Sequence, residues 1–227
     1  MGKWVVQGDD ATLSPPDAQD FVPGPKSKWV PTKAAKGDDS GALWWDHDDP
    51  GQPGHQGEDG WPGAPGRDGA NGGNTPQGVK LYIPADTDTT LTLVLSGGNA
   101  QPGGRGGVGG MGGEGQDGGD GDDEQPPGEG GKGGTGGPGG IGGAGGKGGT
   151  AYDVDVVLEG NVNWSNVIQQ THQGLGGRGG DGGPGGPGGP GGKRGDDGPQ
   201  APSGDYGPPG PPGPRGADGY LGHFHSV

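Results

Sequence analysis

Residues whose chemistry could support a site are few in this sequence, and they lie in short stretches. The stretch Asp46 to Asp49, in LWWDHDDPG, offers oxygen ligands for a divalent cation, but it lacks EF-hand spacing, and acidic clusters in an acidic chain are usually solvated. His223 and His225 would share a face only in an extended chain, and a flexible terminus is the simpler interpretation. We therefore predict no metal site and no cofactor.

Nothing in the sequence resembles catalytic machinery. The chain has no Cys and few His, and no Ser has a plausible base near it in the sequence. The stretch GKGGT at 146–150 lacks the strand and helix that flank a phosphate-binding loop. RGD at 194–196 matches a cell-attachment tripeptide by letters alone. The sequence predicts a non-enzymatic protein.

The composition excludes an ordinary globular domain. The 227 residues include 67 Gly and 25 Pro, and only 23% are hydrophobic. Gly costs about 1 kcal/mol and Pro about 3 kcal/mol against Ala inside a helix, so no long α-helix is expected. This composition is typical of a periodic fibre or of disorder, and the spacing of the glycines distinguishes the two.

Charge and hydropathy restrict the partners. The net charge of −15 disfavours a nucleic-acid partner. No apolar stretch resembles a signal peptide or a membrane span. We expect no membrane insertion, and a location in a virion or in an extracellular surface assembly.

Glycine recurs at every third position in five runs, which are 51–72, 103–121, 130–149, 174–198 and 204–222. The first and last are Gly-X-Y, and the others are mainly Gly-Gly-X. A chain with three residues per turn places every third residue on one stripe, so two bare stripes let neighbouring backbones approach and exchange hydrogen bonds. The period predicts a bundle of polyglycine-II (polyproline-II-like) helices with small β-hairpins and essentially no α-helix.

The glycines expected to make the packing contacts lie in the three Gly-Gly-X runs. They are Gly103, Gly104, Gly106, Gly107, Gly133, Gly134, Gly136, Gly137, Gly179, Gly180, Gly182 and Gly183. The third residues of the triplets, such as Glu114 and Thr135, are expected to face solvent. A homotrimeric collagen-like stalk, favoured by GPPGPPGPR, and disorder are the alternatives.

Two apolar patches alternate like strands and are predicted to form β-hairpins, at 79–96 and 151–170. The predicted plan is an attachment arm at 1–50, a Gly-X-Y rod at 51–74, hairpins alternating with rods over 75–222, and a tail at 223–227. The Trp-rich arm would bind a larger assembly or copies of the chain, or would cover the hairpins of its own chain. The residues predicted to bind a partner are Trp4, Trp29, Trp44, Trp45 and Trp61.

In repeat style, the Gly-Gly-X runs at 103–121, 130–149 and 174–192 resemble the polyglycine-II domain of distal tail-fibre adhesins of T-even-like bacteriophages. They are also similar to the snow flea antifreeze proteins. The first resemblance implies an N-terminal segment that docks on a fibre tip and loops that contact a bacterial receptor. The second implies an ice-binding face of small residues and Thr, where this chain has Arg, Lys, Asp and Glu, so antifreeze activity is not expected.

From these patterns the expected function is that of a structural or recognition protein, most specifically a phage tail-fibre adhesin or related surface component that binds a larger assembly and a cell-surface receptor. The alternative is a self-assembling extracellular fibre or coat subunit, or the collagen-like stalk, in which chains associate with one another.

Overall fold

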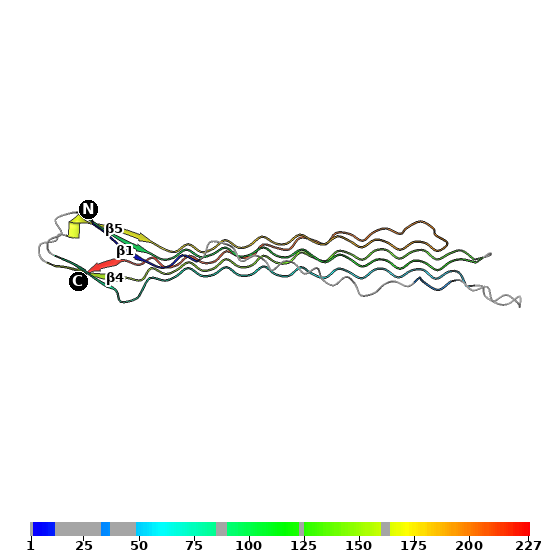
Figure 1. Ribbon diagram of the computed structural model, residues 1–227, viewed down its shortest axis with the longest axis horizontal. Helices are drawn as coiled ribbons and strands as arrows, with labels where there is room; N and C mark the ends of the chain where they lie inside the picture. The colour runs from blue at the N-terminus through cyan, green and yellow to red at the C-terminus, as the bar shows by residue number, and fades with distance from the viewer. Residues whose placement is uncertain (1, 12–32, 37–48, 85–89, 123–124, 160–163) are drawn as a thin grey trace.

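The computed structural model describes residues 2–11, 33–36, 49–84, 90–122, 125–159 and 164–227. It is an elongated body in which all the strands gather at one end, and glycine-rich extended segments run side by side away from them (Figure 1). These segments are named here segment I (51–75), segment II (97–121), segment III (128–151), segment IV (174–198) and segment V (201–222).

The regular secondary structure is β. The strands are β1 (Gly2–Gln7), β2 (Lys80–Ile83), β3 (Leu91–Ser96), β4 (Val154–Leu158), β5 (Val167–His172) and β6 (Phe224–Ser226), with a 3-10 helix η1 at Trp164–Asn166. They form two three-stranded sheets with the orders β1-β3-β5 and β2-β4-β6, and every neighbouring pair is parallel.

The predicted fold class, a bundle of polyglycine-II helices with small β-hairpins, is therefore wrong. The structure has two small parallel sheets, and η1 is the only helix among the described residues. The predicted hairpin partners β2 and β3 belong to different sheets, as do β4 and β5. Each strand instead pairs with the equivalent strand one repeat later, as in Leu91 with Val167 and Lys80 with Asp155.

The glycine segments explain why the pairing is parallel. Segments I, III and V lead into β2, β4 and β6, whereas segments II and IV leave β3 and β5. Each sheet therefore continues into one layer of extended segments, with parallel chains inside a layer and antiparallel chains between the layers. Each strand lies in the layer of the glycine segment that it joins. Strands β2 and β3 are consecutive in the chain but join segments of different layers, so they lie in two sheets that face one another across the core.

A triplet of segment III shows how the backbone is satisfied. Gly133 N–H donates to Pro202 O (3.1 Å) in the same layer, and Gly134 N–H donates to Gly113 O (2.8 Å) in the other layer. The third N–H, that of Thr135, donates to the carboxylate of Asp59 (2.9 Å). All three donors of the triplet are thus paired outside their own segment, as burial of a backbone requires.

Glycine is needed in these segments for close approach and not for conformational freedom. Among the described glycines, Gly78 alone has a positive φ (68°). However, a Cβ atom on Gly133 would lie 1.9 Å from Gly189 O, and one on Gly137 would lie 2.0 Å from Trp61 O. Any side chain at these positions would collide with a neighbouring backbone.

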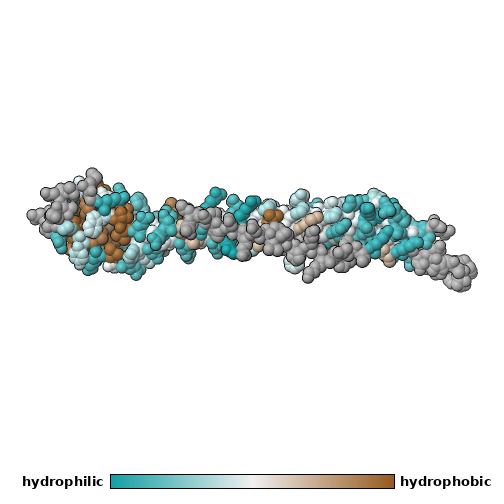
Figure 2. Space-filling view, in the orientation of Figure 1, coloured by the Kyte–Doolittle hydropathy of each residue, from teal (hydrophilic) through white to brown (hydrophobic). Residues whose placement is uncertain are grey.

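The apolar core lies between the two sheets at the strand end. Leu91, Leu93 and Leu95 of β3 pack against residues of the facing sheet, including Val154 and Val156 of β4. Figure 2 shows the hydrophobic atoms gathered at this end, with mainly hydrophilic atoms on the visible face of the glycine segments. Burial of apolar area stabilises the sheets, and lateral hydrogen bonds hold the rest of the body.

Gly137→Val should destabilise the protein by about 3 kcal/mol, the upper end of the usual cost of overpacking, because the atoms in its way are backbone atoms that cannot rotate aside. Thermal or denaturant unfolding followed by circular dichroism measures this change. Glu114→Ala, at an exposed third position of segment II, should change stability by less than about 0.5 kcal/mol. Equal losses in the two variants would contradict the close-approach argument.

Candidate functional site

Side chains able to meet a ligand lie on the third residue of each triplet in segments II and III. The glycines around them are buried or half-buried against neighbouring segments, whereas Arg105, Val108 and Met111 in segment II and Lys132 in segment III are exposed. The surface along these segments is consequently a set of parallel rows of third residues, and its chemistry depends on which residues face one another in adjacent rows.

Acidic and amide side chains in these rows have a structural role. An Asp or Asn in one segment accepts the N–H of a third residue in the next segment of its layer, always 76 residues later in the chain. The acceptor and donor residues are Asp59 and Thr135, Asp68 and Ala144, Asn71 and Lys147, Asn74 and Thr150, Asn99 and Leu175, Asp117 and Lys193, and Asp120 and Asp196. Four Asp and three Asn side chains therefore take the place of backbone acceptors.

Two buried glutamines do the same between the layers. Gln101 and Gln116 stand where the repeat of segment II would have glycine, and both side chains are buried. The Oε1 of Gln116 accepts His55 N–H and that of Gln101 accepts Ala70 N–H, each at 3.0 Å. A polar side chain fits inside this body because its oxygen takes the place of a carbonyl.

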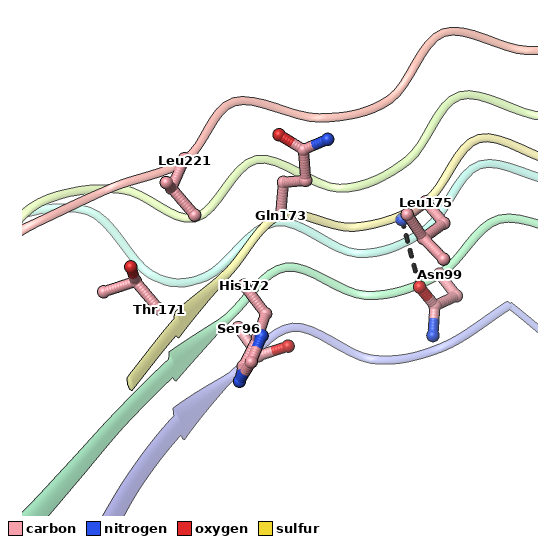
Figure 3. A pocket seen from close by; sticks show the side chains of 7 residues that line it. All are labelled: Ser96, Asn99, Thr171, His172, Gln173, Leu175 and Leu221. Carbon is pink, nitrogen blue, oxygen red and sulfur yellow. Dashed lines mark hydrogen bonds between the residues drawn. The ribbon is translucent and has the colours of Figure 1, made fainter. Parts of the chain in front are cut away.

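One hollow lies where β3 and β5 pass into segments II and IV. It measures about 510 Å³ and is lined by Ser96, Asn99, Thr171, His172, Gln173, Leu175 and Leu221. Figure 3 shows the His172 and Ser96 side chains next to one another, and the bond from Leu175 N–H to Asn99 Oδ1 (3.0 Å). This hollow combines a hydroxyl, an imidazole and leucine side chains, and no sequence pattern pointed to it.

The two C-terminal histidines lie on the edge of the second sheet and not in a free tail. Asp153 Oδ1 accepts the backbone N–H of His223 at 2.8 Å, and Asp153 Oδ2 lies 3.3 Å from Nε2 of His225. First the His223 N–H and then the His225 side chain hold the pKa of the Asp153 carboxyl below its ordinary value. The arrangement secures the short strand β6.

The opposite end of the body carries a charged turn. The Asp120 carboxylate accepts hydrogen bonds from the Lys33 ammonium and from Asp196 N–H, which hold its pKa below the ordinary value. Arg194 Nε lies 3.3 Å from Glu129 Oε1. Asp196, with φ at 58°, also accepts Gly121 N–H through its carboxylate. The Arg194–Asp196 tripeptide is thus tied into the turn by structural bonds.

Two of the predicted partner-binding tryptophans, Trp4 and Trp61, lie among the described residues. Trp4 lies in β1, opposite Leu93, and is 42% exposed, and Trp61 in segment I is 60% exposed. Trp29, Trp44 and Trp45 lie outside the described residues, as do Asp46 to Asp48. The structure does not bring Trp4 and Trp61 together, and binding of a partner by these residues stays a prediction.

The predicted packing glycines lie inside the two layers or against segment V. A Cβ atom on Gly103, Gly106, Gly179 or Gly180 would come within about 2.1 Å of a carbonyl oxygen of an adjacent segment. Gly104 and Gly107 donate to Arg67 O and Ala64 O, each at 2.7 Å. The remaining members Gly134, Gly136, Gly182 and Gly183 show the same close approach.

Within the part of the chain that the structure describes, no group of three or more His, Asp or Glu side chains could hold a metal ion. The described residues also include no helix long and apolar enough to cross a membrane.

No model of a known protein family matches this chain, and no curated protein does. Among solved structures, it matches a springtail antifreeze protein from Granisotoma rainieri, described as a nine polyproline type II helical bundle. The two sequences are 23% identical over 69% of this chain and 93% of the other, with a TM-score of 0.09. Overlap this poor carries no argument about fold or function.

The lowered pKa values of Asp120 and Asp153 predict a contribution to stability with a defined pH range. A carboxyl whose folded pKa lies below its unfolded value of about 4 stabilises the folded state above that value, and this contribution is lost as pH falls through the folded pKa. Asn at both positions keeps an acceptor oxygen but cannot titrate. The fall in Tm between pH 5 and pH 2 should be smaller in the Asp120→Asn, Asp153→Asn variant than in the unchanged protein, and an equal fall would contradict this assignment.

Proposed function

We propose that the protein is a non-enzymatic structural and recognition component of a larger assembly, such as a phage tail-fibre adhesin or a related surface component. The observation that carries the proposal is the closure of both lateral margins of the I-III-V layer, which confines that layer to three segments of one chain. A component that holds its two ends far apart must be stiff, and the hydrogen bonds between neighbouring segments make this body stiff.

Segment V closes one margin. The residue before each of its layer-to-layer glycines corresponds to Gly133 of segment III, whose N–H donates to segment V in the same layer and whose Cβ would strike Gly189 O of segment IV in the other layer. In segment V these positions hold Tyr206, Pro209, Pro212 and Arg215. Their side chains occupy the space that a further segment beside segment IV would need, and Pro209 and Pro212 have no N–H to donate to a further segment of their own layer.

Segment I closes the opposite margin. The residue after each of its in-layer glycines corresponds to Gly134, whose Cβ would strike Glu58 O of the preceding segment in the layer. In segment I this position holds residues such as Trp61 and Arg67, so their side chains point to the outside of the layer. This argues against a fibre that grows by addition of chains to the margins of the I-III-V layer.

The Gly-X-Y segments also have partners within the chain. Gly57 N–H donates to Lys132 O (2.9 Å), and Gly210 N–H donates to Gly183 O (2.8 Å). A collagen-like stalk would need these glycines at the axis of three chains, and the intrachain bonds remove that need.

Light scattering coupled to small-angle X-ray scattering tests the proposal. We expect a particle of one chain, 22.0 kDa, with a radius of gyration of about 30 Å, because an extended body of this segment length spans about 100 Å. A compact protein of this size would give about 17 Å. A mass of three chains would favour the stalk, and polymers would favour the fibre subunit.

The recognition part needs a separate measurement. Fluorescently labelled protein should bind saturably to some members of a panel of bacterial cells and be displaced by unlabelled protein. A monomeric rod that binds no cell in a broad panel would count against the adhesin while leaving a purely structural role.

A further inference from the structure

A second, smaller hollow on the side of the body has the features of an anion site, and the inference does not rest on the proposed function. Its basis is the row of third residues in segment IV, from Leu175 to Asp196. At Leu175, Lys193 and Asp196 the outward N–H is bonded by an Asn or Asp side chain of segment II. Figure 3 shows the first of these bonds.

Three other third residues of this row have no N–H to satisfy. They are Pro184, Pro187 and Pro190, and the residues 76 positions earlier are Val108, Met111 and Glu114. None of these is Asp or Asn. Segment II thus places Asp or Asn beside N–H groups at Leu175, Lys193 and Asp196 and neither beside proline, so the rows match in sequence as well as in space.

Arg178 and Asp181 break the match. Each keeps a backbone N–H, and the residues 76 positions earlier are Pro102 and Arg105, which have no side-chain acceptor. Within the described ranges, no hydrogen bond satisfies either N–H. Two outward donors therefore lie in succession at the place where a carboxylate or amide lies in other triplets.

These two donors lie in a hollow with two guanidinium groups. The hollow measures about 240 Å³ and is lined by Pro102, Gly103, Arg105, Arg178, Gly179, Gly180 and Asp181. Arg178 is 86% exposed in its side chain, and its Nη2 lies 3.9 Å from Asp181 Oδ1, too far for a hydrogen bond. This long ion pair leaves the N–H donors of the Arg178 guanidinium unbonded by Asp181, and no ion pair among the described residues involves Arg105, so both groups can donate to an anion although the net charge of the chain is −15.

We infer that this hollow binds a carboxylate side chain of an extended acidic peptide. The carboxylate accepts Asp181 N–H and pairs with the Arg105 guanidinium, and so takes the place that Asp117 and Asp120 occupy in their own triplets. A carboxylate that receives both kinds of donor is held more strongly than by either one.

An extended peptide fits better than a free ion because the surface continues along the same rows. Arg178 and Pro102 lie one triplet from Leu175 and Asn99, which line the larger hollow beside Ser96 and His172. The acid at Arg105 lies two triplets, about 19 Å, from Leu175, so an extended peptide of about six residues reaches the apolar surface of Leu175 as well.

Amide chemical shifts of the ¹⁵N-labelled full chain, titrated at low salt with acetylated, amidated tri-glutamate, test the inference. We expect saturable shifts at Arg178 and Asp181, at least tenfold weaker binding in 0.5 M NaCl because the contacts are charged, and no saturable shifts with the matched tri-glutamine peptide. Equal shifts with both peptides would overturn the inference. Equal affinity for sodium acetate and tri-glutamate would overturn its peptide part.

Arg105→Asp is the sharpest variant, because it places a carboxylate where Asp117 and Asp120 have theirs. It should bond Asp181 N–H internally, slow hydrogen exchange of that amide and abolish peptide binding. Arg105→Gln should weaken binding at least tenfold, whereas Glu114→Gln, opposite Pro190, should leave it unchanged. Wild-type binding by Arg105→Asp, in a protein whose spectrum shows it folded, would overturn the assignment.

Discussion

The constraint on which the structure depends is the approach of one backbone to another at a distance that no side chain allows. With carbonyl oxygens about 2 Å from the place of a Cβ atom, as at Gly133 and Gly137, the neighbouring chains can bond through N–H and C=O at every triplet. Order then comes from lateral hydrogen bonds, each of modest net value, repeated along the body. The small apolar core between the sheets is needed only at the end where glycine gives way to Leu and Val.

That constraint also explains where charge lies. Once two residues of a triplet face neighbouring chains, the third must satisfy its own N–H, and water, proline or an adjacent Asp or Asn can meet that need. At Lys193 the N–H is satisfied by a hydrogen bond to Asp117, and at Pro187 there is no N–H to satisfy. These Asp and Asn side chains are part of the fold, and a place with neither proline nor an adjacent Asp or Asn, as at Asp181, becomes a candidate for binding.

The sequence predicted where most strands form, but it did not predict which strands pair with one another. Alternation predicted strand-forming residues within 79–96, because a strand shows its period within a few residues, and in the structure Leu91, Leu93 and Leu95 of β3 are buried. The sequence pattern predicted that β2 and β3 form one hairpin, because a short polar stretch separates them. In the structure the directions of the flanking glycine segments place the two strands in different sheets. Strands β1 and β6 were missed because pairing with β3 and β4 supports them more than their own patterns do. The hydrogen bonds over 76 residues could have been found by comparing the positions of Asp and Asn in successive runs.

The constant interval between bonded residues limits how this chain can change length. A triplet added to segment II alone would leave its new N–H and C=O groups beside empty space, and would shift the match between Asp117 and Lys193. Growth by insertion is therefore tolerated at the turns, or by one triplet in every segment together. All segments must therefore change length together. Related chains that form longer or shorter bodies should differ by the same multiple of three residues in each segment.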